Sequence, residues 1–144
     1  VGLMCLKIFC SGNDKLFDEL VKPAEMLGSA FQKVNFLRDL KADTEGLDRV
    51  YFSNFNKNHF DEQTKIELIH EIESEFDIAL SGLKRLPGRS KLAVLTAYNY
   101  YRTLLLKIKR TEASAILKKR IRISNTRKIT LMAKAAIEYK VKRV

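Results

Sequence analysis

The spacing of apolar residues is helical along almost the whole chain. Residues 61–85 are the clearest case, because apolar side chains recur there every three or four positions and so share one face of an α-helix. The residues on that face are Ile66, Ile69, Ile72, Phe76 and Leu83. No stretch shows the alternation of apolar and polar positions that is typical of a half-buried strand. The pattern therefore predicts an all-α fold.

Breaker and capping residues divide this pattern into separate helices. Pro23 suits the first turn of a helix, where its missing N–H costs nothing. Asp61 is expected to cap the next helix, and Pro87 with Gly88 to end it, while residues 44–60 have loop character. We expect helical segments at residues 1–10, 15–21, 23–42, 61–85, 91–109, 112–117 and 125–142, with a break at residues 11–14.

Length and composition fit one helical domain. The chain has 144 residues, of which 46% are hydrophobic, enough for a modest core. It shows no signal-peptide pattern and no apolar run long enough to span a membrane. Cys5 and Cys10 fit neither a C-x-x-C motif nor a zinc spacing, so we expect reduced thiols. These features predict a cytoplasmic protein.

Charge is distributed unevenly between the two parts of the chain. Residues 1–83 hold 9 Lys and Arg against 15 Asp and Glu, whereas residues 84–144 hold 18 against 2, so their net charges are −6 and +16. This asymmetry indicates an anionic partner for the second part. No zinc finger, basic zipper or RNA-binding string is present, so diphosphate or anionic lipid is expected rather than nucleic acid. A basic helical module that binds nucleic acid remains the alternative from another functional class.

The C-terminal segment combines cations with apolar positions. Its basic residues are Arg127, Lys128, Lys134, Lys140, Lys142 and Arg143, and its apolar residues are Ile129, Leu131, Met132, Ile137 and Val141. Such a helix is compatible with peripheral contact at an anionic membrane surface. Packing against the rest of the bundle is the alternative.

Oxygen-bearing side chains recur every four residues in the helix predicted at 23–42. Asn35, Asp39 and Asp43 share one helix face, one turn apart from each other. Mg²⁺ prefers oxygen ligands and is usually bound by one or two carboxylates together with substrate phosphates. Arg38 lies beside this stripe and can bind a phosphate through two parallel hydrogen bonds. A lone D-x-x-x-D is otherwise often a solvated helix surface.

A longer string of residues around this stripe is more specific. It comprises Leu27, Gly28, Ala30, Phe31, Gln32, Asn35, Arg38, Asp39 and Asp43, followed by Arg49, Tyr51 and Phe52. This string resembles the second aspartate-rich region of the squalene and phytoene synthase family, approximately L-G-x-A-x-Q-x-x-N-x-x-R-D-x-x-x-D followed by R-x-Y. The opening V-G-L-M and the segments at 97–109 and 118–128 also resemble that family. The resemblance implies the isoprenoid synthase helical bundle and the head-to-head joining of two prenyl diphosphates.

The resemblance also implies roles for individual residues. Asn35, Asp39 and Asp43 match the family's Mg²⁺ ligands, with Mn²⁺ as a possible substitute, and Asp39 and Asp43 would be the catalytic pair. Residues matching the diphosphate-binding positions are Arg38, Gln32, Tyr101 and Arg120. Residues matching the R-x-Y pattern are Arg49 and Tyr51, which would anchor the following loop. Residues that would either line a cavity for the substrate tail or belong to the core are Leu27, Phe31 and Phe36.

The resemblance covers only one of the family's two metal-binding helices. The other aspartate-rich helix has no counterpart in the sequence, so we expect the chain to be the C-terminal half of the domain and inactive without the N-terminal half. Ala42 and Ser53 depart from the usual pattern, which affects the subfamily rather than the chemistry. Another terpenoid synthase, such as a terpene cyclase or a head-to-tail prenyltransferase, remains an alternative, although the usual motifs of those enzymes, N-D-x-x-S-x-x-x-E and D-D-x-x-D, are absent. The choice between C15 and C20 substrates and the use of NADPH stay open.

Overall fold

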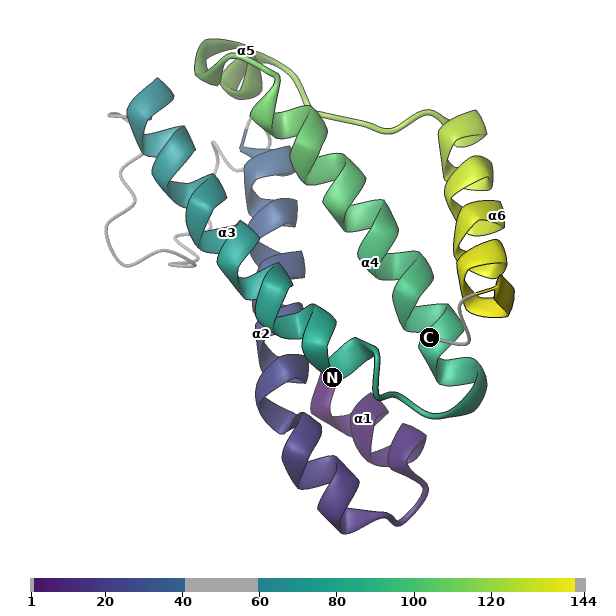
Figure 1. Cartoon of the computed structure of the whole chain (residues 1–144). Coiled ribbons are helices and arrows are strands. Elements are labelled where there is room, and N and C mark those ends of the chain that lie inside the picture. The colour runs from purple at the N-terminus through teal and green to yellow at the C-terminus, as the bar shows by residue number, and fades with distance from the viewer. Residues whose placement is uncertain (1, 41–59, 142–144) are drawn as a thin grey trace.

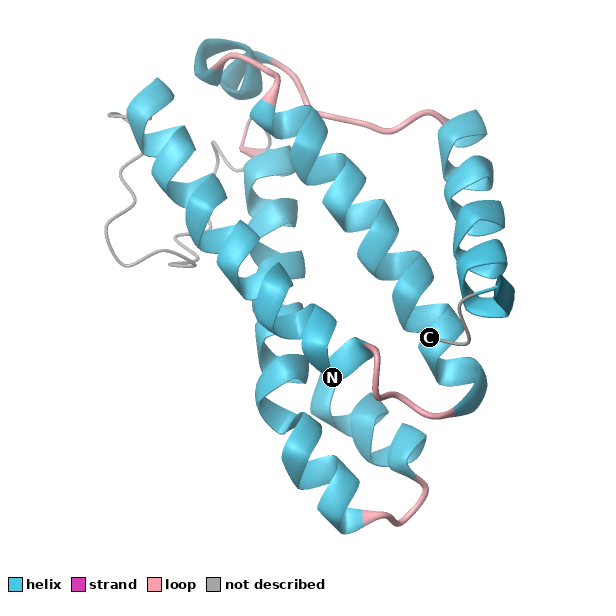
Figure 2. Cartoon of the chain, viewed as in Figure 1, coloured by secondary structure: helices cyan, strands magenta, loops and turns pink. Residues whose placement is uncertain are grey.

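The structure, a computed structural model, describes residues 2–40 and 60–141. In these two ranges the chain forms helices joined by loops, without strands, which confirms the all-α prediction (Figure 2). The helices are α1 (Gly2–Cys10), α2 (Asp14–Asp39), α3 (Glu62–Leu83), α4 (Gly88–Lys109), α5 (Ala113–Lys118) and α6 (Asn125–Val141).

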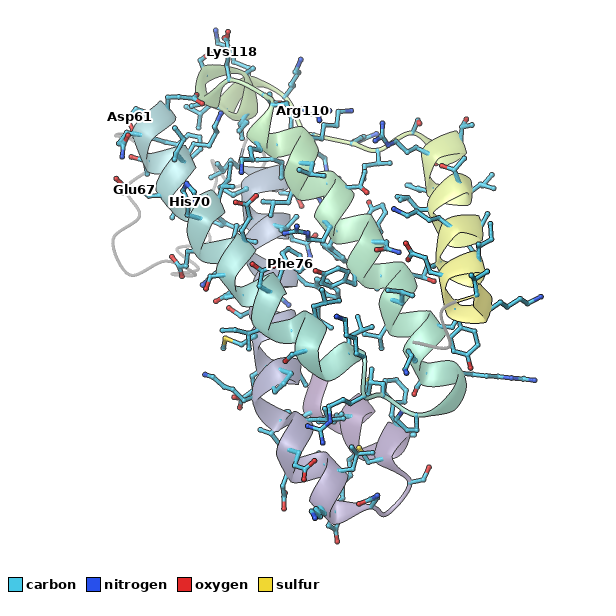
Figure 3. The ribbon with its side chains drawn as sticks, in the orientation of Figure 1. Asp61, Glu67, His70, Phe76, Arg110 and Lys118 are labelled. Carbon is cyan, nitrogen blue, oxygen red and sulfur yellow. The ribbon has the colours of Figure 1, made fainter. Side chains whose placement is uncertain are left out.

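Three long helices form the body of the structure. Helices α2, α3 and α4 pack on one another, α1 packs on α2, and α6 packs along α4 on the side away from α3 (Figure 1). Phe76 lies fully buried between α3 and α4, in the main core that these helices share (Figure 3). A second, smaller core forms where Leu6 and Cys10 of α1 contact Leu20 of α2 and Leu86.

Helix α2 is continuous, so the predicted division between residues 15–21 and 23–42 is wrong. Pro23 lies inside the helix, where it removes one backbone hydrogen bond. Its ring packs directly on α3, because a Cβ built on Gly82 would lie only 2.3 Å from the Cβ of Pro23. Packing of the Pro23 ring against Gly82 therefore allows α2 to continue through the proline. The helix begins at Asp14, which is the last residue of the break predicted at residues 11–14.

Helix α3 begins as the sequence predicts. The Asp61 carboxylate accepts a hydrogen bond from the Thr64 backbone N–H at 2.8 Å, and this bond lowers the pKa of Asp61. The predicted apolar face is largely buried, but Ile66 is 41% exposed. Lys65 is buried instead, at 2% exposure. After the C-terminal end of α3, helix α4 starts at Gly88, three residues earlier than expected.

Lys65 is buried because it binds the end of another helix. Its Nζ donates to the carbonyl oxygens of Lys109 and Thr111, at 3.4 and 2.8 Å, and forms an ion pair with Glu62. Glu62 also accepts a hydrogen bond from the backbone N–H of Ala113, the first residue of α5. A cation at the carbonyl end of a helix and a carboxylate at the amide end of the next are both favourable. This pair therefore connects α3, α4 and α5.

Lys33 connects α2 to α3 in a similar way. It donates to Glu71 and to Glu75, the latter at 2.6 Å, and Ser29 donates to the same Glu75 oxygen at 2.8 Å. Burial opposes the charge of Lys33, but its hydrogen bonds to the two carboxylates outweigh burial, so its pKa is raised. The polar contacts thus fix the α2–α3 pair that Pro23 and Gly82 bring together.

We expect Gly82→Ala to destabilise the protein by about 1–3 kcal/mol, because the new methyl group overlaps the Pro23 ring. Gly28→Ala is the matched control. It also replaces a helical glycine, but its Cβ meets no atom within 4 Å, so it should stabilise by up to about 1 kcal/mol. Urea unfolding followed by circular dichroism measures both. Pro23→Gly, which removes the Cβ that the new methyl group overlaps, should rescue part of the Gly82→Ala loss, and an additive double mutant would contradict the proposed contact.

Candidate active site

The last turns of α2 carry a cluster of polar side chains. Asp39 is the final residue of the helix, and Arg38 donates to its Oδ2 through Nε at 3.0 Å and through Nη2 at 2.5 Å. This hydrogen bond raises the pKa of Arg38, although partial burial acts in the opposite direction. Both side chains are about four-fifths buried, with exposures of 20% and 22%. Arg38 therefore stays charged beside a carboxylate that is shielded from bulk water.

Two residues from distant parts of the chain complete the cluster. Arg120, in the segment after α5, places Nε 2.6 Å from Asp39 Oδ1 and Nη2 3.5 Å from Oδ2. Tyr101 of α4 accepts a hydrogen bond from Asn35 Nδ2 at 3.2 Å. The structure thus brings together five of the predicted site residues: Asn35, Arg38, Asp39, Tyr101 and Arg120. Two guanidinium groups meet one carboxylate here, an arrangement able to receive an anion with several oxygens.

Two buried oxygens of this cluster lack hydrogen bonds. Asn35 Oδ1 and Asp39 Oδ1 are both inaccessible to solvent and accept no hydrogen bond, but Asp39 Oδ1 is ion-paired with Arg120 Nε at 2.6 Å, so of these two only Asn35 Oδ1 is without a partner. A buried polar atom without a partner is costly, and such atoms often mark a site for an ion or ligand. Carboxylate and amide oxygens one helical turn apart are ligands that suit Mg²⁺ or Mn²⁺. These residues therefore fit an oxygen-binding cation.

The other predicted site residues are placed differently. Gln32 is exposed on α2, and its role as a diphosphate ligand stays a prediction. Asp43, Arg49 and Tyr51 lie outside the described residues. Within ranges 2–40 and 60–141, no three His, Cys, Asp or Glu side chains come close enough to hold a metal ion. Asn35 and Asp39 thus supply part of a ligand set.

An apolar cavity of about 290 Å³ lies between α1, α2, α3 and α4. Its lining contains two small residues from each of the three long helices: Ala24 and Gly28, Ala79 and Gly82, and Ala93 and Ala97. Because the members of each pair are three or four residues apart, they share a helix face. Small side chains on three facing helices leave the space that larger ones would fill. The remaining lining residues are Gly2, Cys5, Leu6, Phe9, Leu20, Pro23, Leu27, Phe31, Leu83, Leu86 and Val94.

An aromatic stack separates the cavity from the polar cluster. Phe31 lines the cavity and lies one turn before Asn35, and Tyr101 lies one turn after the lining residue Ala97. The rings of Phe31 and Tyr101 are stacked, with centroids 4.0 Å apart and an interplanar angle of 18°. The hydroxyl of Tyr101 faces Asn35 while its ring covers Phe31. One face of α2 thus runs from an apolar chamber to a charged end.

The sequence indicated part of this cavity. Leu27 and Phe31 line it, as one of the two interpretations expected, whereas Phe36 packs against the main core. The lining residues of α1 and α4 were missed. The paired small residues at positions 24 and 28, and at 93 and 97, were the available signal. They become informative only when the helices are known to face each other.

Tyr101 makes two contacts that substitution can separate, a hydrogen bond through its hydroxyl and a stack through its ring. Tyr101→Phe keeps the stack on Phe31 and removes the hydrogen bond from Asn35, so we expect a loss of about 1 kcal/mol in stability. Tyr101→Ala also removes the stack and should cost about 3 kcal/mol or more. Chemical denaturation measures both values. Equal losses in the two variants would mean that the ring contributes nothing beyond its hydroxyl.

Comparison with known proteins gives one match. A family model described as Squalene/phytoene synthase matches residues 1–127. Searches of curated proteins and of solved structures found no match. The matched range includes the polar end of α2, Tyr101 of α4 and Arg120. The chain belongs to the squalene/phytoene synthase family.

Proposed function

We propose that this chain forms one wall of a site that joins two prenyl diphosphates head-to-head, as in squalene or phytoene synthases. The observation that carries the proposal is the continuity of one α2 face. It begins in an apolar cavity at Leu20, passes Phe31 and ends at Asp39. At 1.5 Å per residue, Phe31 to Asp39 spans about 12 Å. A prenyl diphosphate has the same order of parts, an apolar tail followed by an anionic head group.

The polar end would receive the diphosphate. Arg38 and Arg120 offer planar donor groups that bind phosphate oxygens in pairs and neutralise their charge. Asn35 and Asp39 would hold Mg²⁺ or Mn²⁺, together with the predicted ligand Asp43. When bound, the metal ion neutralises charge on the diphosphate as the allylic C–O bond ionises. Asn35 is kept in position by its hydrogen bond to Tyr101.

The apolar end would hold the prenyl tail and exclude water. Its lining side chains are hydrocarbon apart from the Cys5 thiol, which is the one nucleophilic side chain among them. Excluding water protects an allylic cation from quenching. The stack of Phe31 and Tyr101 places aromatic faces at the boundary where positive charge would develop, and aromatic faces attract cations.

We expect the protein to bind farnesyl thiodiphosphate, an analogue that resists ionisation, in a Mg²⁺-dependent manner. Asp39→Ala should weaken this binding about tenfold or more, because it removes a metal ligand. Arg38→Lys should weaken it similarly, since a point charge does not replace a two-donor fork. Titration calorimetry with and without Mg²⁺ measures the effects.

The controls for this titration are Asp77→Ala and Arg89→Lys, which alter exposed residues on α3 and α4. Both should bind the analogue as the unaltered chain does. Binding that is independent of Mg²⁺, or an Asp39→Ala variant with unchanged affinity, would refute the proposed metal and diphosphate site. A product assay with Mg²⁺ and farnesyl or geranylgeranyl diphosphate then tests turnover.

The tail cavity has a separate test in Gly28→Phe. The new ring has space to enter the cavity, because a Cβ at Gly28 meets no atom within 4 Å. We expect about tenfold weaker binding of farnesyl thiodiphosphate and unchanged Mg²⁺-dependent binding of inorganic pyrophosphate. Gly28→Ala, which fills little of the cavity, should leave both affinities nearly unchanged. Equal losses for both ligands in Gly28→Phe would mean that the tail does not occupy this cavity.

A further inference from the structure

Arg120 lies in an extended segment between two helices. The chain leaves the helical conformation at Lys119, whose φ and ψ are −144° and 141°, and becomes helical again at Asn125, the first residue of α6. The Arg120 side chain is 47% exposed, and its ion pair with Asp39 joins this segment to the end of α2. A long side chain has many rotamers, so it reaches one place reliably only where its backbone is held. The contacts that hold residues 119–124 therefore decide where the guanidinium group lies.

Apolar side chains hold this segment against the core on one side. Ile121 and Ile123 are 3% and 6% exposed and belong to the main core, whereas Arg120 and Arg122 are exposed. This alternation is typical of an extended chain with one buried face. It sets the side to which Arg120 points. Apolar contacts are non-directional, however, so they do not fix the position of the segment along its own axis.

Directional bonds fix the chain before Arg120. The buried Lys65 of α3 donates to two carbonyl oxygens where α4 ends, and its partner Glu62 accepts from the Ala113 N–H, at the start of α5, at 3.1 Å. Figure 1 shows α5 at the end of the structure where α4 ends and α3 begins. Helix α5 has only six residues, and Arg120 lies two residues beyond its last one. The Glu62–Lys65 pair thus fixes the point from which the chain reaches Arg120.

A lysine of α4 fixes the chain after Arg120. Lys107, in the last turn of α4, donates from Nζ to the carbonyl oxygen of Arg122 at 2.5 Å. Arg120 is therefore held between two hydrogen-bonded points, Ala113 and Arg122, which are bound to α3 and to α4 respectively. Both bonds involve the backbone, so they set the position of the chain itself.

We propose that Glu62, Lys65 and Lys107 are positioning residues for Arg120. They act through the backbone of residues 109–122 rather than by contact with a ligand. A guanidinium group binds phosphate oxygens through two parallel hydrogen bonds only when its plane is correctly placed, so a shift of its backbone weakens both bonds. The inference rests on the proposed function, because it takes Arg120 as a diphosphate ligand.

The test is Mg²⁺-dependent binding of inorganic pyrophosphate, measured by titration calorimetry. Arg120→Ala should weaken binding about tenfold or more, because charge-assisted hydrogen bonds are lost. Lys65→Met and Lys107→Met should each weaken it about threefold or more through the displaced arginine. Glu62→Gln keeps an oxygen that accepts from Ala113, so it should weaken binding less than Glu62→Ala does.

Double variants show whether these residues act through Arg120. When Arg120 is already alanine, Lys65→Met and Lys107→Met should change pyrophosphate affinity less than about twofold, because no guanidinium group is left to position. A general loss of structure or of positive charge would weaken binding equally with and without Arg120. Lys107 is exposed, so its variant should keep the helix content that circular dichroism measures, even if Lys65→Met unfolds part of the chain.

Two matched controls use the same substitution elsewhere. Lys33→Met removes the other buried lysine, which joins α2 to α3, and Lys84→Met removes an exposed cation just after α3. Both should bind pyrophosphate within about twofold of the unaltered chain, because neither residue holds the segment of Arg120.

The possible outcomes separate this inference from the proposed function. Unchanged affinity in Lys65→Met and Lys107→Met, equal losses with and without Arg120, or equal losses in the controls would overturn the positioning role alone. If the unaltered chain showed no Mg²⁺-dependent binding of pyrophosphate, the proposed function would fail and this inference with it.

Discussion

The close approach of Pro23 and Gly82 is the constraint on which the rest of the structure depends. A proline inside a helix removes a hydrogen bond and crowds the preceding turn, so an unbroken α2 needs compensation. Gly82 supplies it by letting α3 come within contact of the proline ring, where any Cβ would overlap. The two helices then face each other along their length, with Lys33 paired to Glu71 and Glu75. Because α2 is continuous, its apolar and polar segments share one face.

The sequence predicts much of this fold, and its errors have physical causes. Helical periodicity, the Asp61 cap and the break at residues 11–14 depend on neighbouring residues, so local reasoning finds them. The continuity of α2 depends on a glycine almost sixty residues away, which no local rule includes. A distant contact also explains why Lys65 is buried on α3 while the neighbouring Ile66, which was expected to be buried, is exposed. Lys65 is buried because the carbonyl oxygens at the end of α4 accept its hydrogen bonds, and those carbonyls come from a distant segment.

The candidate site likewise contains residues that local sequence patterns predict and features that depend on distant segments. Asn35, Arg38 and Asp39 could be predicted as site residues because they lie close together on one helix and belong to the longer string that resembles the family. Tyr101 and Arg120 came from the resemblance alone, and the structure places both beside that cluster. The cavity depended on small residues of three separate helices, which carry no motif by themselves. The sequence shows that charge is distributed unevenly along the chain, but only the structure shows that Glu138 of α6 accepts a hydrogen bond from Asn99 of α4.

The arrangement around Asp39 would couple the two binding events proposed for the site. Its carboxylate accepts hydrogen bonds from Arg38 and is ion-paired with Arg120, so both guanidinium groups would compete with a metal ion for it. A diphosphate would offer those arginines a more highly charged partner with more oxygens. Asp39 would then be available to hold a cation, whose charge would favour the diphosphate. Each ligand would thereby raise the affinity for the other, which is the reciprocity that binding linkage requires. In the proposed site, the metal ion and the diphosphate head group would thus bind at the end of α2 more tightly together than either does alone.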